Sequence, residues 1–150
     1  MVSMLEVVLH KHLDGFRLDV AFALGDLDDA MLDGLARYGV WRYCFGRDLS
    51  RAEPYAGARE VMDAAPVTAS SLVARPGNGA GGRLVYQSWS RTLPHSIGRN
   101  RDNMQRKSIE FVARALEQLH RSGPAWLDER PVCDPIGPAA PRTAQPPGSG

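Results

Sequence analysis

Two apolar runs of strand length constrain the fold of this chain more than any other feature. The first covers residues 20–24 and is followed by Gly25 and an acidic turn; the second covers residues 39–46 and has a glycine at each end. Continuous apolar runs, as opposed to alternating ones, are typical of strands buried on both faces, as in a parallel α/β sheet. Between them, Asp28-Asp29 precedes an apolar repeat, which predicts a helix ending near Arg37.

A hairpin follows in the sequence. Residues 67–74 and 83–90 are strand-like, and the glycine-rich segment 76–82 between them contains Asn78-Gly79. Asn-Gly supplies the positive φ angles of a tight hairpin, so we expect antiparallel pairing. The glycines match the sequence pattern of a dinucleotide-binding motif, but a strand follows them where that motif requires a helix. Alternation predicts that Ser70 and Ser71 lie on an exposed face, and no nucleophile-elbow pattern surrounds them.

Three further helices are expected, at residues 3–13, 54–64 and 96–121. The last is long and apolar along one face, and Gly123-Pro124 ends it. The predicted fold class is therefore α/β, a small partial Rossmann-like parallel sheet with an antiparallel hairpin and a long C-terminal helix. Residues 1–125 would form this domain. Residues 126–150 are rich in proline and glycine, which predicts a disordered tail.

Composition limits the ligand classes and the cellular compartments that suit this chain. The formal net charge of +1 gives no electrostatic case for nucleic acid, and no run approaches the roughly 18 apolar residues of a membrane span. The start of the chain lacks a signal-peptide pattern, and Cys44 and Cys133 are not placed for a structural disulfide. We therefore expect a cytoplasmic protein. His10 and His12 lack further ligands at recognised spacing, so no metal site is expected.

The start of the long helix is the candidate site. Cations there oppose the helix dipole, and a bound anion would resolve that conflict. Phosphate, or the diphosphate of a sugar nucleotide, is the expected ligand. The residues of this candidate anion site are His95, Ser96, Arg99, Asn100 and Arg101. The alternatives are that Ser96 caps the helix beside an exposed His95, and that the arginines pair with Asp48, Glu53 or Asp102.

The order of elements resembles the formyltransferase fold of methionyl-tRNA formyltransferase and its relatives. The resemblance covers roughly residues 15–125, and it is greatest to divergent formyltransferase-like domains of bacterial sugar-transferase-type proteins. It is carried by Leu18-Asp19-Val20-Ala21-Phe22-Ala23-Leu24, Ala36-Arg37-Tyr38-Gly39-Val40-Trp41, Ala64-Ala65-Pro66-Val67-Thr68-Ala69-Ser70-Ser71-Leu72-Val73 and an Arg-Asn-Arg helix start at residues 99–101. It implies transfer of a one-carbon unit from 10-formyltetrahydrofolate to an amine. It also implies that the opening β-α-β portion of the fold is missing before Met1.

The same resemblance places the family's catalytic histidine on Cys44 or Phe45 and its aspartate on Ala80. Neither replacement does acid–base work, which alone supplies about 10²–10⁴ in rate. The leading hypothesis is thus a catalytically degenerate formyltransferase-like domain, without a cofactor, that binds or acts as scaffold in a larger transferase-type protein with a neighbouring domain or partner chain. One alternative is an active formyl- or glycosyltransferase that uses His95 with Asp48 or Glu53. Another is a protein-interaction module whose missing strands come from a partner.

Overall fold

The computed structural model describes residues 13, 15–24, 32–46, 56–77 and 81–133. Several sequence-based expectations lie outside these residues. They are the helix at 3–13, the histidines His10 and His12, the loop that carries Asp48 and Glu53, Ala80 in the hairpin turn, and the tail beyond Cys133.

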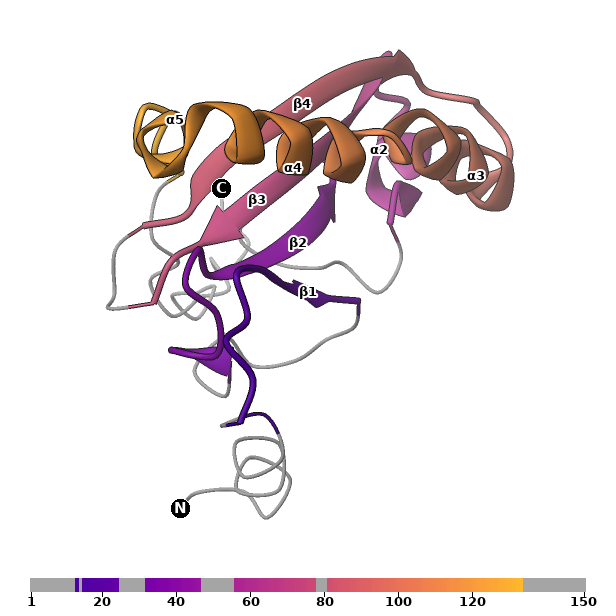
Figure 1. Ribbon diagram of the computed structural model, residues 1–150. Helices are drawn as coiled ribbons and strands as arrows, with labels where there is room; N and C mark the ends of the chain where they lie inside the picture. Colours follow the sequence, from indigo (N-terminus) through magenta and orange to yellow (C-terminus); the bar gives the residue numbers. More distant parts are fainter. Residues whose placement is uncertain (1–12, 14, 25–31, 47–55, 78–80, 134–150) are drawn as a thin grey trace, which may run out of the picture.

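The described strands form one mixed sheet in the order β1-β2-β3-β4 (Figure 1). The strands are β1 (Ala21–Ala23), β2 (Val40–Phe45), β3 (Val67–Arg75) and β4 (Arg83–Arg91). The two apolar runs pair in parallel in one sheet, as predicted. The hairpin prediction is also confirmed, because β3 and β4 are antiparallel. Since β2 also runs antiparallel to β3, only β1 and β2 are a parallel pair, which is a smaller parallel part than the partial Rossmann-like sheet that we expected.

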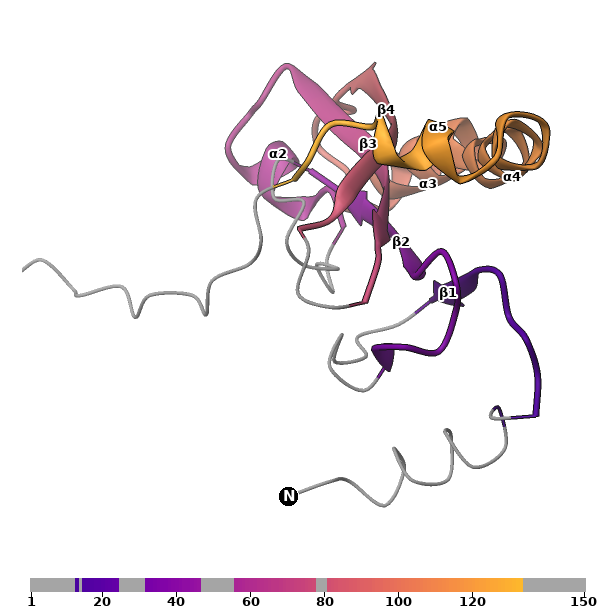
Figure 2. The ribbon, with the colours of Figure 1, turned by 60° about the vertical axis from the view of Figure 1, so that its left-hand side comes forward.

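Helices pack on one face of this sheet (Figures 1 and 2). They are α3 (Ile97–Ser108), α4 (Phe111–Ser122) and α5 (Pro124–Asp128), while the short α2 (Ala58–Met62) contacts α3. The main core joins sheet residues Trp41, Leu72, Ala74 and Val85 to helix residues Phe111, Ala115, Leu119 and Leu127. Tyr86 is partly buried against this core, where it stacks on Phe111 with ring centroids 5.7 Å apart.

The predicted continuous helix at 96–121 is bent into α3 and α4, and the cause is a side chain from β2. The hydroxyl of Tyr43 donates to the carbonyl oxygen of Ser108 over 2.8 Å, and it also has a hydrogen bond with the backbone of Val112. In a straight helix the Val112 amide would donate to Ser108, four residues earlier. A hydroxyl inserted between these two groups is a recognised cause of helix kinks.

The predicted helix that ends at Arg37 is wrong in its described part, because residues 32–37 form turns. Gly34 has a φ of 76°, and Arg37 donates its backbone N–H to the carbonyl oxygen of Leu18 over 2.9 Å. This hydrogen bond ties the segment to the chain before β1 and takes the place of a hydrogen bond within a helix. The helix predicted at 54–64 is present only as α2, which begins after Gly57.

Two further expectations are corrected by packing. Ser70 and Ser71 are 2% and 0% exposed, because both faces of β3 are covered there. The ordered chain also continues past residue 125, since Leu127 enters the main core and Cys133 packs on Cys44 and Val73. The predicted tail is therefore part of the fold at least as far as Cys133. In the described part of the chain, no helix has the length and apolar character needed to cross a membrane.

Candidate functional site at the start of α3

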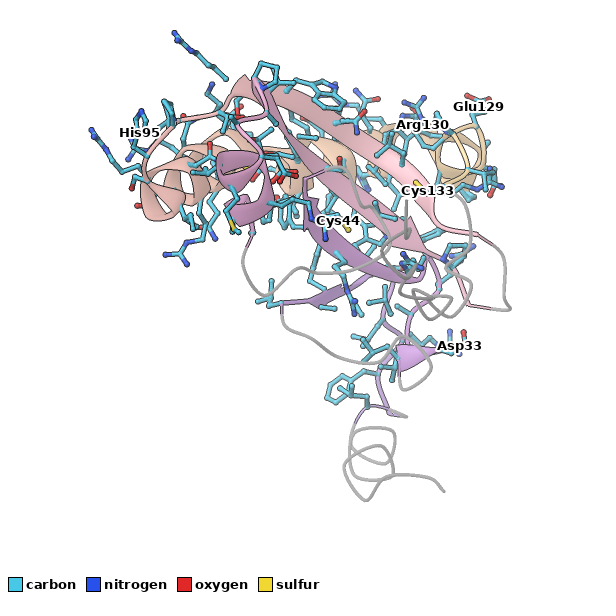
Figure 3. All side chains as sticks on the ribbon, turned by 180° about the vertical axis from the view of Figure 1, so that it is seen from behind. Asp33, Cys44, His95, Glu129, Arg130 and Cys133 are labelled. Carbon is cyan, nitrogen blue, oxygen red and sulfur yellow. The ribbon has the colours of Figure 1, made fainter. Side chains whose placement is uncertain are left out.

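Ser96 begins α3 as its N-cap. Its backbone is extended, and its hydroxyl oxygen accepts a hydrogen bond from the Arg99 N–H over 3.2 Å. The capping interpretation of Ser96 is therefore confirmed. His95, just before it, is exposed and has a φ of 68°, a left-handed conformation in which histidine is one of the commoner non-glycine residues. Figure 3 shows its side chain at the outer end of the helix layer, far from Cys44.

Asn100 lies one turn further on and points into the protein. It is 0% exposed, and its amide makes three hydrogen bonds. The Nδ2 group donates to the carbonyl oxygen of Gly57 over 3.1 Å and to Oγ1 of Thr68 over 3.3 Å. The Oδ1 atom accepts from the Leu93 N–H over 3.0 Å. Asn100 thus ties together the start of α2, the start of β3 and the chain after β4, and its amide faces away from the expected anion site.

Thr92 extends this group, because its hydroxyl lies 2.8 Å from that of Thr68. We call Asn100, Thr68, Thr92, Gly57 and Leu93 the Asn100 cluster. Every one of its polar side-chain oxygens and nitrogens has a protein partner. A buried network that is fully satisfied rigidifies the fold, whereas a partly satisfied one would be costly.

Local sequence explains why the cluster forms. Asn100 stands four residues before Met104, which is 0% exposed, so both lie on the inward face of α3. Gly57 has a φ of 75°, and a Cβ atom there would lie 2.8 Å from Asn100 Nδ2 and 2.5 Å from Met104 Cε. Only glycine combines this backbone conformation with such a close approach.

The two arginines of the candidate anion site stay at the surface. Arg99 is exposed, and no carboxylate stands in the first turn of α3. Arg101 lies near its neighbour Asp102, with 4.0 Å between Nε and Oδ1, which agrees with one of the three pairings considered from sequence. The two residues are 50% and 66% exposed, so this contact adds little to stability.

Two of the three positions that the formyltransferase resemblance assigns to catalysis, Cys44 and Phe45, are packing positions, and the third, Ala80, lies outside the described residues. Cys44 is 1% exposed inside the cluster with Val73 and Cys133, and no disulfide joins the two cysteines. Phe45 stacks on Tyr43 with ring centroids 6.0 Å apart. Burial raises the pKa of the Tyr43 hydroxyl, and the backbone hydrogen bond with Val112 partly opposes this rise.

Sequence reasoning missed one buried acid. Glu60 on α2 is 4% exposed, and its Oε2 atom has no hydrogen-bond partner. Its Oε1 atom lies 2.7 Å from the place where a Cβ of Gly46 would stand, so the carboxylate faces the end of β2. The described residues contain no group of three or more histidine, cysteine or acidic side chains placed to hold a metal ion.

No family model matches this chain, and no curated protein is significantly similar to it. The formyltransferase resemblance therefore stays a hypothesis carried by the order of elements and the quoted phrases.

Proposed function

We propose that this chain is a non-catalytic, formyltransferase-like domain that serves as a scaffold within a larger transferase-type protein. The observation that carries the proposal is the Asn100 cluster. A side chain that binds or activates a substrate needs an unsatisfied polar atom facing the ligand. The Asn100 amide is fully buried, and its three hydrogen bonds go to Gly57, Thr68 and Leu93, so it faces no ligand.

The places assigned to acid–base chemistry support the same conclusion. Cys44 is enclosed by apolar neighbours, and Phe45 carries no ionisable group. Neither residue would shuttle a proton to a formyl donor or acceptor.

The rival function is an active formyl- or glycosyltransferase in which His95 works with Asp48 or Glu53. His95 is exposed at the start of α3, and both acids lie outside the described residues. This rival makes a sharp prediction, because it requires the His95 imidazole for turnover.

A transfer assay tests the proposal. The full chain is incubated with 10-formyltetrahydrofolate and a panel of amino acids, amino sugars and aminoacyl-tRNA, and formylated products are measured by mass spectrometry. We expect no turnover above an enzyme-free blank. The matched controls are His95→Ala and His120→Ala, since His120 is a second exposed histidine at the end of α4. Turnover that is lost in His95→Ala but kept in His120→Ala would overturn the proposal and favour the rival.

A further inference from the structure

The outer edge of β4 is an open strand edge over Gln87–Arg91. β4 is the last strand of the sheet, opposite β1 (Figure 1). The first part of its edge is covered by the chain itself, because Leu84 donates to the carbonyl oxygen of Pro131 and Cys133 donates to that of Gly82. No described residue pairs with the outer side of β4 beyond that point.

The register shows which backbone groups point outward. Thr92 donates to the carbonyl oxygen of Pro66 over 3.0 Å, so residues 66 and 92 form a hydrogen-bonded pair. Hydrogen-bonded and non-hydrogen-bonded pairs alternate along an antiparallel ladder. Thr68 and Ser90 are then hydrogen-bonded, while Trp89 and its partner Ala69 are not. The hydrogen bonding of Ala69 is consistent with this register, because its carbonyl oxygen accepts from the Gly46 N–H on the β2 side and not from β4.

It follows that the N–H and C=O groups of Gln87, Trp89 and Arg91 point away from the sheet. Natural proteins usually protect such an edge with proline, lysine, an inward charge or a bulge. The bulge of this hairpin lies between Leu72 and Val73, opposite the covered end of β4. The open end has no proline or lysine, its one charged residue is Arg91 at the end of the strand, and it exposes 54% of Trp89.

We infer that this edge pairs with the same edge of a second copy of the chain, antiparallel and centred on Trp89. This inference goes beyond the scaffold proposal and rests on different residues. In that register Trp89 faces Trp89 of the other copy, and Gln87 faces Arg91 in both directions. All three outward residues of each strand then form hydrogen-bonded pairs, with two bonds in each pair and about six in total.

The side chains favour self-pairing over pairing with a foreign strand. A two-fold axis makes an interface self-complementary, so a lone charge at the axis would face itself. Here the residue at the axis is an aromatic, and the flanking Arg91 faces the neutral Gln87. Cross-strand aromatic pairs stabilise a sheet, while like charges directly opposite destabilise it. Val67, 38% exposed and opposite Arg91 on β3, widens the apolar strip beside the axis.

Sedimentation of the full chain across micromolar concentrations tests whether it dimerises. We expect a reversible dimer in the wild-type protein. Trp89→Lys should weaken it about tenfold or more, because two like charges would meet at the axis. Ile109→Lys is the matched control, since Ile109 is 74% exposed at the α3–α4 bend and should leave the dimer intact. A monomer throughout, or a dimer equally stable in Trp89→Lys, overturns the inference.

Cross-linking tests the register. In the double variant Gln87→Cys/Arg91→Cys, each new cysteine faces its complement on the other copy, at a Cα separation of about 5.5 Å that suits a disulfide. The two positions are too far apart on one strand to bridge within a chain. We expect a cross-linked dimer from the double variant under mild oxidation, and none from Gln87→Cys or Arg91→Cys alone. A cross-link in a single variant, or none in the double variant, contradicts pairing centred on Trp89.

Discussion

Removal of the Asn100 amide is the perturbation that bears most on this structure. In Asn100→Ala the Leu93 N–H and the Gly57 carbonyl lose the bonds that Asn100 makes to them, and the Thr68 hydroxyl keeps only its contact with Thr92. Each intramolecular hydrogen bond contributes about 1 kcal/mol, and a buried group left unsatisfied costs about 1–3 kcal/mol. Alanine recovers roughly 0.5 kcal/mol because it is the better helix former. We therefore expect a loss of about 2–4 kcal/mol in the free energy of unfolding.

Urea unfolding followed by circular dichroism measures this loss. Asn103→Ala is the matched control, because Asn103 lies on the same helix and is half-buried, whereas Asn100 is fully buried. We expect Asn103→Ala to lower the free energy of unfolding by much less than Asn100→Ala does. If Asn100→Ala is as stable as Asn103→Ala, the cluster does not hold the elements together and the reasoning fails.

Three other outcomes are expected. Tyr43→Phe should lower the free energy of unfolding by about 1–2 kcal/mol through loss of the hydroxyl at the helix bend. Because burial raises the pKa of Tyr43 above its ordinary value of 10.0, that contribution is complete below pH 10 and is lost as the pH rises through the folded-state value, so the difference in melting temperature between the two proteins should narrow in alkali. Gly39→Ala should destabilise the fold by about 1–3 kcal/mol or more, since Gly39 has a φ of 80° and the new Cβ would lie against the Arg75 backbone. A midpoint of urea unfolding equal to the wild-type value would contradict this. Phosphate should raise the melting temperature of the wild-type protein but not of Arg99→Ala/Arg101→Ala, and an equal response of the two proteins, or none, would mean that the start of α3 binds no anion.

The sequence predicted the sheet better than the helices. Residues 20–24 are apolar throughout, residues 39–46 are largely apolar despite Arg42, and the Asn-Gly turn specifies its hairpin locally. These signals need no information from elsewhere in the chain. The bend at Ser108 could not be predicted in this way. It depends on the hydroxyl of Tyr43, which stands 65 positions earlier on β2.

Burial was the other source of error. Alternation predicted an exposed face for Ser70 and Ser71, but both faces of β3 are covered and both serines are buried. The proline-rich composition after residue 125 predicted a disordered tail, but Leu127 and Cys133 in that segment pack in hydrophobic clusters of the fold. Average composition is a poor guide when a few well-placed side chains supply the contacts.

The candidate site was predicted in position but not in orientation. The pattern located the start of α3 and its capping serine, yet it grouped Asn100 with Arg99 and Arg101 by sequence proximity. Neighbouring residues on a helix point about 100° apart, so Asn100 faces inward while Arg99 and Arg101, on either side of it, stay at the surface. The spacing of Asn100 from Met104 was the available signal, because residues four apart lie on the same face and Met104 belongs to the apolar one.

The exchange of the Leu93 backbone amide tests most directly whether Asn100 is a structural residue. Leu93 lies outside every strand and helix, and its N–H has Asn100 Oδ1 as its acceptor. We expect hydrogen–deuterium exchange at Leu93 to be slow and to require opening of the surrounding fold, and we expect it to become fast in Asn100→Ala. An amide that exchanges in the wild-type protein as fast as an open loop would contradict the structural role of Asn100 and, with it, the scaffold proposal.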